Sequence, residues 1–142
     1  MKRDELERRL KAEGCSPALY AVGDCRGASD AFCLAERRGR WSVFYTERGV
    51  NSAPIFESRS EEEACEFFFR HITSLRHLHC VGFFRSEARA RSLRSELQSH
   101  GVASTEDRIP FDGPQEPRFR VFVEGKAVFS ARELLGDIPV ED

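Results

Sequence analysis

Residues 31–47 read AFCLAERRGRWSVFYTE, and this stretch decides the fold. Two runs rich in apolar and aromatic residues flank an Arg-Gly-Arg turn at 38–40, a pattern that predicts a β-hairpin. In the second run Trp41, Val43 and Tyr45 alternate with Ser42, Phe44 and Thr46. Because successive side chains of a strand point to opposite faces, this alternation predicts a sheet with one buried face.

Two helices are predicted around this hairpin. The spacing of Leu6 and Leu10 gives residues 2–13 one narrow apolar stripe, with Gly14 placed to end the helix. Residues 60–63 read SEEE, a capping box with acids at the positive end of the helix dipole. The second helix is predicted to run to about residue 73, and its apolar residues, among them Phe67, Phe68 and Ile72, predict burial against the sheet.

The segments between these elements predict smaller features. They are a single helical turn from Ser16-Pro17 to about Tyr20, a loop over 21–30, a turn over 48–52 and a short strand over Pro54–Glu57.

The second half predicts alternating strands and helices, beginning near residue 77. The predicted elements are a strand over His77–Phe84, a helix from the Ser86 cap to His100, a strand over Val102–Ile109, a turn over Pro110–Pro117, a strand over Arg118–Val123, a short strand over Ala127–Phe129, a helix opened by a capping box at 130–133 and stopped by Gly136, and a loose tail over Asp137–Asp142.

These elements predict an α+β fold of two small similar subdomains. The expected order is α-βββα over residues 1–75 and βα-βββα over residues 76–142, with antiparallel sheets and helices packed on one face. The run Trp41–Glu47 is echoed by Phe119–Glu124, which suggests an internal duplication.

Composition narrows the possible functions. The chain has 142 residues, a net charge of −2 and 12 phenylalanines. A chain of this length can bury a core without metals or disulfides. The near-neutral balance lacks the basic footprint of a nucleic-acid binder. No apolar run reaches the ~18 residues of a membrane helix, and the charged start lacks a signal peptide's apolar region. The sequence therefore predicts a cytoplasmic protein without nucleic-acid or membrane partners.

Motifs for catalysis or cofactor binding are absent. The five cysteines contain no CxxC pair, and His77 and His79 lack further ligands at metal-like spacing. No GxSxG elbow, P-loop or dinucleotide fingerprint occurs. We therefore expect no enzyme, no metal, no cofactor and no small-molecule substrate. The arginines at 85–94 indicate a solvated helix face or a phosphate contact. The pair Glu106-Asp107 indicates a solvated strand end or part of an acidic binding surface.

The first seventy residues resemble a family of small bacterial immunity proteins that neutralise polymorphic toxins. The resemblance lies in five segments, RDEL at 3–6 before a helix ending at Gly14, SPALY at 16–20, FCL at 32–34, WSVFYTERG at 41–49 and EEEAC at 61–65. Family members carry a tyrosine-rich strand ending in Ser-Glu-Arg-Gly, where this chain has Phe44 and Thr46. They also have more glycines after the tyrosine than the two in Val22–Ser29.

The second half is similar to a SPOR-like pattern. The pattern consists of a strand, a helix starting at 86–88, Gly101, another strand and a hairpin containing Phe119–Val123. This resemblance implies a module that binds peptidoglycan glycan strands or acts as an adaptor.

The absent motifs and the first resemblance together predict an immunity protein that occludes the active site of a cognate nuclease or NAD-degrading toxin domain. The alternatives are the SPOR-like module and an unrecognised small enzyme. The partner surface is expected on two segments. The resemblance to immunity proteins implies the first, which holds Tyr45, Glu47 and Arg48. The second is the strand end and loop with Glu106, Asp107, Phe111, Asp112 and Glu116. The second segment puts an aromatic anchor among acids, which suits a cleft with a basic rim.

Overall fold

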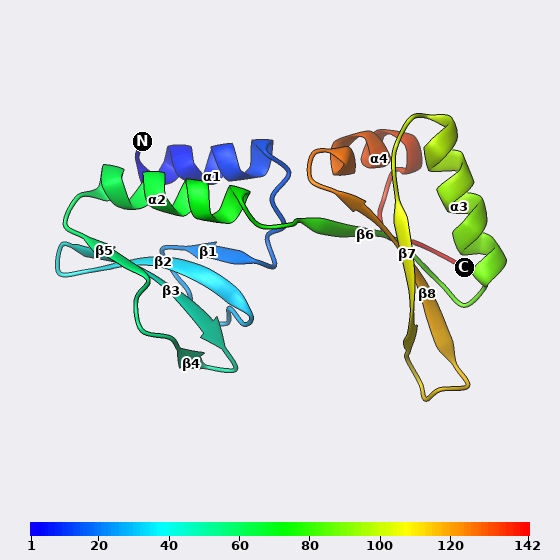
Figure 1. Cartoon of the computed structure of the whole chain (residues 1–142), viewed down its shortest axis with the longest axis horizontal. Helices are drawn as coiled ribbons and strands as arrows, with labels where there is room; N and C mark the ends of the chain where they lie inside the picture. The colour runs from blue at the N-terminus through cyan, green and yellow to red at the C-terminus, as the bar shows by residue number, and fades with distance from the viewer. The chain divides into compact units, whose positions relative to one another are not determined.

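The chain forms two compact units in the computed structural model, which describes all 142 residues (Figure 1). The units are Met1–Arg76 and His77–Asp142, against predicted ranges of 1–75 and 76–142. Each unit combines two helices with one mixed sheet, which confirms the α+β class with two subdomains. None of the four helices combines the length and the hydropathy that a membrane-crossing segment needs.

The first unit is a five-stranded sheet with two helices. Its elements are α1 (Arg3–Ala12), β1 (Tyr20–Val22), β2 (Ala31–Arg37), β3 (Arg40–Glu47), β4 (Val50–Asn51), β5 (Phe56–Ser58) and α2 (Glu61–Thr73). The strands follow the order β1-β2-β3-β4, and β5 also pairs with β3.

The predicted hairpin is confirmed as β2 and β3. Phe32 lies opposite Tyr45 and Leu34 lies opposite Val43, so these side chains share one face. Arg38 and Gly39 both have positive φ, 54° and 77°, as a two-residue turn that matches the strand twist requires.

Helix packing in this unit follows the predicted apolar stripes. Leu6 and Leu10 of α1 are fully buried, as are Phe68 and Ile72 of α2. The Ser60 hydroxyl accepts a hydrogen bond from the backbone N–H of Glu63 at 3.2 Å, which confirms the predicted cap. These residues form one core with Leu34, Val43 and the half-buried rings around them.

Residues 16–30 differ from the prediction. Ser16–Leu19 forms a single hydrogen-bonded turn and not a helical turn. Tyr20–Val22, partly inside the predicted loop, is a strand parallel to β2. A three-residue strand is too short to show alternation, and its partner lies beyond a loop, so local sequence carries no signal for it.

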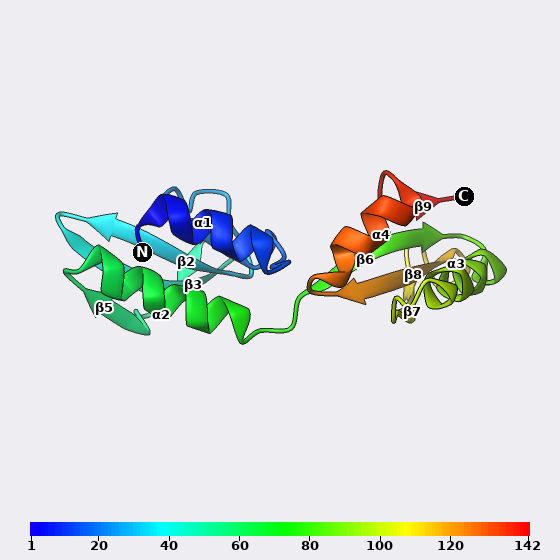
Figure 2. The ribbon, with the colours of Figure 1, turned by 90° about the horizontal axis from the view of Figure 1, so that it is seen from above.

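The second unit has the element order β-α-β-β-α-β. Its elements are β6 (Leu78–Phe84), α3 (Glu87–Ser99), β7 (Thr105–Pro110), β8 (Pro117–Glu124), α4 (Ala127–Leu135) and β9 (Val140–Glu141). The sheet order is β7-β8-β6-β9, a split βαβ arrangement (Figure 2). Both helices share one core on one face of the sheet, built on Val81, Val121 and Val123.

Gly82 lets α3 approach the central strand β6 closely. A Cβ atom at this position would lie 2.6 Å from Leu93 Cδ2 and 2.6 Å from Phe84 Cε2. A side chain here would therefore displace both core residues, and glycine is the residue that leaves this space free.

Three predictions for the end of the chain are wrong. Ala127–Phe129 is the first turn of α4 and not a strand, because Val128 and Ala131 are spaced to face the core as a helix. Ser130 therefore lies inside this helix and does not cap it. The tail is not loose, since β9 pairs in parallel with β6, and the Asp142 carboxylate accepts hydrogen bonds from the backbone N–H groups of Arg85 and Ser86.

These corrections change the predicted topology. The first unit has five strands between its helices and not the three of α-βββα, and the second unit is βαββαβ and not βα-βββα. Each sheet contains one parallel pair, so neither is wholly antiparallel. The two units also differ in strand order. Their likeness is limited to a mixed sheet with two helices.

Candidate functional site

The first predicted segment surrounds the turn between β3 and β4. Tyr45 is half-buried, with its ring 5.0 Å from that of Phe32, whereas Glu47 and Arg48 are exposed. Arg48 has a positive φ of 52°, and its backbone N–H donates to Ser29 Oγ at 3.2 Å. Arg48 therefore has a structural role in the turn, and its guanidinium extends from the exposed surface.

Tyr45 ends a row of aromatic rings. Along the row, the ring centroids of successive neighbours lie 4.3 to 5.9 Å apart, and the members in order are Phe56, Phe67, His71, Phe32 and Tyr45. All five side chains are half-buried. The Nε2 atom of His71 is buried without a hydrogen-bond partner. Of this row, only Tyr45 was predicted from the sequence to lie at a partner surface, and Phe67 was predicted to be buried.

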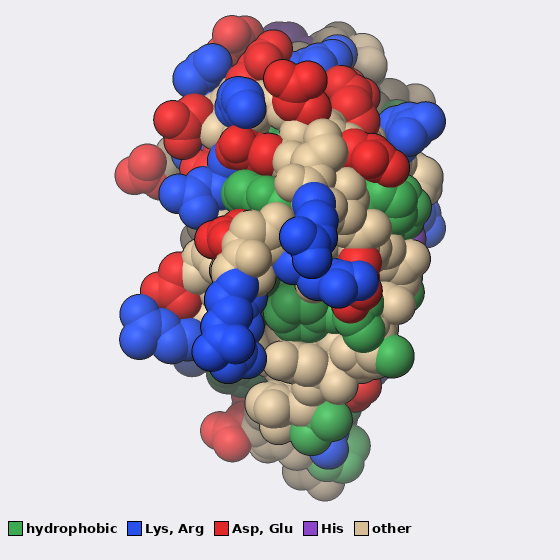
Figure 3. Space-filling model, turned by 90° about the vertical axis from the view of Figure 1, so that its left-hand side faces the viewer, with side chains coloured by type: hydrophobic (Ala, Val, Ile, Leu, Met, Phe, Trp, Pro, Cys, Tyr) green, Lys and Arg blue, Asp and Glu red, His purple; other side chains and the backbone are tan.

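Charged side chains of both signs lie together on the face drawn in Figure 3. In this view, of the side at the left of Figure 1, Lys and Arg side chains are interspersed with Asp and Glu side chains over the upper part, and few charged side chains lie lower down. Small hydrophobic patches lie between them.

The second predicted segment lies on the β7–β8 hairpin, in the other unit. The structure therefore places the two predicted segments on different units. Within the hairpin it also separates Glu106 from Asp107, because neighbouring residues of a strand point to opposite faces. Phe111, Asp112 and Glu116 remain together at the exposed turn.

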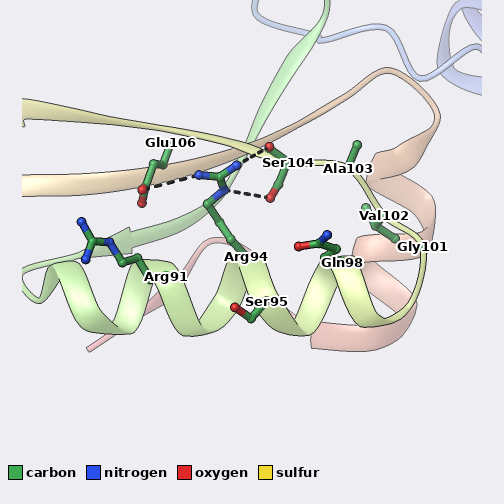
Figure 4. Close-up of a pocket in the computed structure, with 9 residues that line it drawn as sticks. All are labelled: Arg91, Arg94, Ser95, Gln98, Gly101, Val102, Ala103, Ser104 and Glu106. Atoms are coloured by element: carbon green, nitrogen blue, oxygen red, sulfur yellow. Dashed lines mark hydrogen bonds and ion pairs between the residues drawn. The ribbon is translucent and has the colours of Figure 1, made fainter.

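Glu106 faces the helices and borders a hollow of about 720 Å³ (Figure 4). The hollow lies between α3 and the start of β7, and the close-up shows Arg94 reaching across it. The Arg94 guanidinium donates to the Ser104 carbonyl at 3.0 Å and lies 3.5 Å from Glu106 Oε1. Glu106 Oε2 is buried without a hydrogen-bond partner. Arg94 thus fixes the carboxylate and leaves one of its oxygens without a donor.

Asp107 faces the opposite, helix-free side of the sheet. Its two carboxylate oxygens accept hydrogen bonds from Arg120 at 2.8 and 2.6 Å. This pairing raises the pKa of the Arg120 guanidinium above its ordinary value. Asp107 is therefore paired within the fold, and Glu106 and Asp107 lie on opposite faces of the sheet, each beside its own arginine.

The helix-free side carries aromatic and arginine side chains, and we call it the open face: Phe83, Phe111, Phe122, Arg118 and Arg120. The Phe83 and Phe111 rings meet edge to face with centroids 5.4 Å apart. The guanidinium of Arg118 lies 4.4 Å from the Phe111 ring centroid, and that of Arg120 lies 4.9 Å from that of Phe122. Such cation–π contacts hold both components in place.

Phe111 is the most exposed member of the open face. Its side chain is 58% exposed, whereas Arg118 beneath it is only 8% exposed. A hollow of about 210 Å³ adjoins the two rings, lined by Phe83, Phe111, Arg85, Arg118, Glu141 and Asp142. This volume suits one side chain of a protein partner.

Of the open face, only Phe111 was predicted from the sequence to contact a partner. The available signal was the alternation in β8, where Phe119, Val121 and Val123 pack on the core. Residues between them, Arg120 and Phe122, must then share the other face.

The cysteines and histidines form no metal site, since no group of three or more His, Cys, Asp or Glu side chains is placed to hold an ion. All five cysteines are free thiols. Burial raises the pKa of Cys25 to about 12, helped by the neighbouring Cys33 thiol, and raises that of Cys65 to about 11. Thiols with such raised pKa values are poor nucleophiles at neutral pH.

Comparison with protein-family models, curated proteins and solved structures found no match to this chain. The function is therefore inferred from the residues that the chain itself exposes.

Proposed function

We propose that this chain is an immunity protein, which binds the toxic domain of a cognate secreted or contact-delivered bacterial toxin and occludes its active site. It acts by binding, without catalysis, in the cytoplasm of the cell that makes it. The toxin class is a nuclease or an NAD-degrading enzyme.

The observation that carries this proposal is the exposed turn of the β7–β8 hairpin. Phe111 projects there at 58% exposure, stacked on Arg118, with Asp112 and Glu116 exposed beside it. Interfaces concentrate their binding free energy in a few aromatic and arginine anchors, and acidic neighbours favour a basic rim on the partner. A hairpin that presents one ring among acids suits insertion into an enzyme's cleft.

A second support is the resemblance of the first unit to immunity proteins. The resembling strand, WSVFYTERG at 41–49, ends at the exposed Glu47 and Arg48. These two residues and Tyr45 remain the proposed contact in the first unit.

The test is co-expression of the full chain with the toxic domain encoded beside its gene, scored by cell growth and by binding of the purified proteins. We expect the wild-type chain to protect. We expect Phe111→Ala to weaken binding by about tenfold or more, the effect of losing an anchor. The charge reversals Asp112→Lys and Glu116→Lys together are expected to slow association.

The matched control is Glu96→Lys, an exposed charge reversal on α3 away from the hairpin. It should leave protection and affinity unchanged. Reversal of Glu106 or Asp107 requires a separate folding check, because each change removes an arginine's partner within the fold. Failure of the wild-type chain to bind the adjacent toxic domain would contradict the proposal.

The second candidate is the SPOR-like module, and the open face is the observation that favours it. Phe83 and Phe122 lie on neighbouring central strands of the sheet, where flat rings offer stacking surfaces for sugars. Retention of the chain on peptidoglycan glycan strands, lost in Phe122→Ala, would favour this candidate over the first.

A further inference from the structure

The outer edge of β7 has no strand paired with it. β8 is the only neighbour of β7 in the sheet, and Figure 2 shows β7 at the margin of the second unit. An edge strand presents a row of free backbone N–H and C=O groups, which can pair with another strand. What that edge can accept depends on the side chains beside it.

Two complementary charges on β7 share the face covered by helices. Glu106 lies opposite Val121 and Arg108 lies opposite Phe119 in the β7–β8 register, and both partners pack on the core. Glu106 Oε2 is buried without a donor. The Arg108 guanidinium lies 5.7 Å from the Phe119 ring centroid and makes no ion pair. An acceptor without a donor and a cation without an anion therefore lie two residues apart.

We propose that β7 pairs in antiparallel fashion with β7 of a second copy of this chain, in the register centred on Asp107. A two-fold axis through that point puts Glu106 of each copy directly opposite Arg108 of the other. Two equivalent ion pairs form, each between the Glu106 carboxylate of one copy and the Arg108 guanidinium of the other. The two four-stranded sheets join into one.

Neighbouring registers are excluded by charge and by side-chain direction. A pairing centred on Glu106 sets two glutamates opposite each other, and one centred on Arg108 sets two arginines opposite each other, which is unfavourable. A shift by a single residue moves the charged side chains to opposite faces, so Glu106 and Arg108 cannot meet.

The centre of the favoured register brings two Asp107 carboxylates together. Each is already held by two hydrogen bonds from Arg120 of its own chain, at 2.8 and 2.6 Å. The centre is therefore two neutral pairs and not two free anions. Charges on an edge strand ordinarily prevent pairing; here the same charges permit pairing in one register.

This proposal goes beyond the immunity function and does not depend on it. The surface is the edge of the sheet, whereas the toxin contact is proposed for the hairpin turn and for Tyr45, Glu47 and Arg48.

The test is sedimentation velocity on the full chain at concentrations up to about 1 mM, a range that detects even weak association. We expect a concentration-dependent dimer. Amide hydrogen exchange of 105–109 should slow as the concentration rises, because the outward N–H groups become bonded. A chain that stays monomeric over the whole range, with unchanged exchange, would overturn the proposal.

Charge variants test the register. The Arg108 guanidinium lies over the Phe119 ring and forms no ion pair within the fold. Arg108→Glu should raise the dissociation constant of the dimer by about tenfold or more, because the new glutamate faces Glu106 of the other copy. Mixing this variant with Glu106→Lys should restore a one-to-one dimer. One edge then carries two acidic side chains and the other carries two basic ones, so each acid faces a base. Circular dichroism checks that Glu106→Lys folds; if it does not, the Arg108→Glu result and hydrogen exchange decide. Glu96→Lys, on the exposed side of α3, is the control. A dimer dissociation constant that Arg108→Glu leaves unchanged would contradict this interface.

Discussion

Asp107 and Arg120 form a two-hydrogen-bond ion pair across β7 and β8, with atoms 2.8 and 2.6 Å apart. The pair joins residues that are directly opposite in the register. It also holds Arg120 against the Phe122 ring. Asp107 therefore helps to position Arg120, one of the two arginines of the open face.

The first prediction concerns the strength of this pair. Its side chains are 31% and 43% exposed, so solvent screens much of the attraction, and we expect a coupling of about 0.5–1 kcal/mol. The measurement is a double-mutant cycle with Asp107→Asn and Arg120→Gln, followed by urea unfolding. Additive effects of the two substitutions would show that the geometry contributes no stability.

The second prediction concerns the first core. Phe68 is fully buried, whereas its neighbour Phe67 is half-buried and stacked on Phe56. Phe68→Ala is expected to reduce the free energy of unfolding by about 3–5 kcal/mol, and Phe67→Ala by less, because less area leaves the core. Trp41, the one tryptophan, lies in this unit and reports its unfolding by fluorescence. Equal costs for the two variants would contradict the burial difference.

The third prediction concerns alkaline pH. The pKa values of Cys25 and Cys65 rise to about 12 and about 11 in the folded chain, against about 8.5 in the unfolded chain. Folding therefore favours the neutral thiols. Their contribution to stability is complete below the unfolded pKa and is lost as pH rises toward the folded values, since the unfolded chain releases these protons first.

Urea unfolding between pH 7 and pH 10, followed by Trp41 fluorescence, measures this loss. Cys65→Ala serves as the control, because removing one thiol should flatten the pH dependence even though it lowers stability at every pH. An identical slope in the two proteins would mean that other groups cause the decline.

The fourth prediction concerns β9. Val140 lies opposite Gly82 in the parallel pair with β6 and packs against the second core. Val140→Ala is expected to cost the second unit about 1–2 kcal/mol of stability. Because Trp41 and both tyrosines lie in the first unit, the measurement is thermal unfolding followed by far-ultraviolet circular dichroism.

Val50→Ala is the matched control for this fourth experiment. Val50 is 72% exposed in the first unit, and the change should stay within about 0.5 kcal/mol. A Val140 variant as stable as the wild type would restore the loose tail that the sequence predicts.

Elements with local signals were predictable from the sequence. The caps at Ser60 and Ser86 both accept the expected backbone hydrogen bonds, and Gly14 ends α1 with a positive φ of 72°. The β2–β3 hairpin follows from alternation and turn chemistry. Each of these features depends on residues only a few positions apart, so one sequence window contains the whole cause.

Elements stabilised by distant partners were not predictable. β1 and β9 have three and two residues, and each pairs in parallel with a strand separated from it along the chain. α4 begins at Ala127, and its N-cap residue Lys126 makes no side-chain capping hydrogen bond, so the serine at 130 was wrongly predicted to start the helix. In each case packing in the folded unit, and not a local motif, selects the structure.

The candidate site shows the same division. Glu106 and Asp107 are adjacent in the sequence and look like one acidic pair, but the pleat of β7 sends them to opposite faces. Their partners, Arg94 and Arg120, come from α3 and β8. The spacing of residues along the sequence predicts which side chains share a face of the strand. It does not predict the strand register, which decides the partner of each acid.

The parallel pairing of β6 with β9 also sets how the second unit responds to mechanical force. Tension applied through the start of β6 and the end of β9 pulls these parallel strands in opposite directions. Their hydrogen bonds, between Gly82–Phe83 and Val140–Glu141, are then loaded together in shear and do not break one after another. A pull on Asp142 first loads the hydrogen bonds that its carboxylate accepts from the Arg85 and Ser86 backbone N–H groups, and then this strand pair.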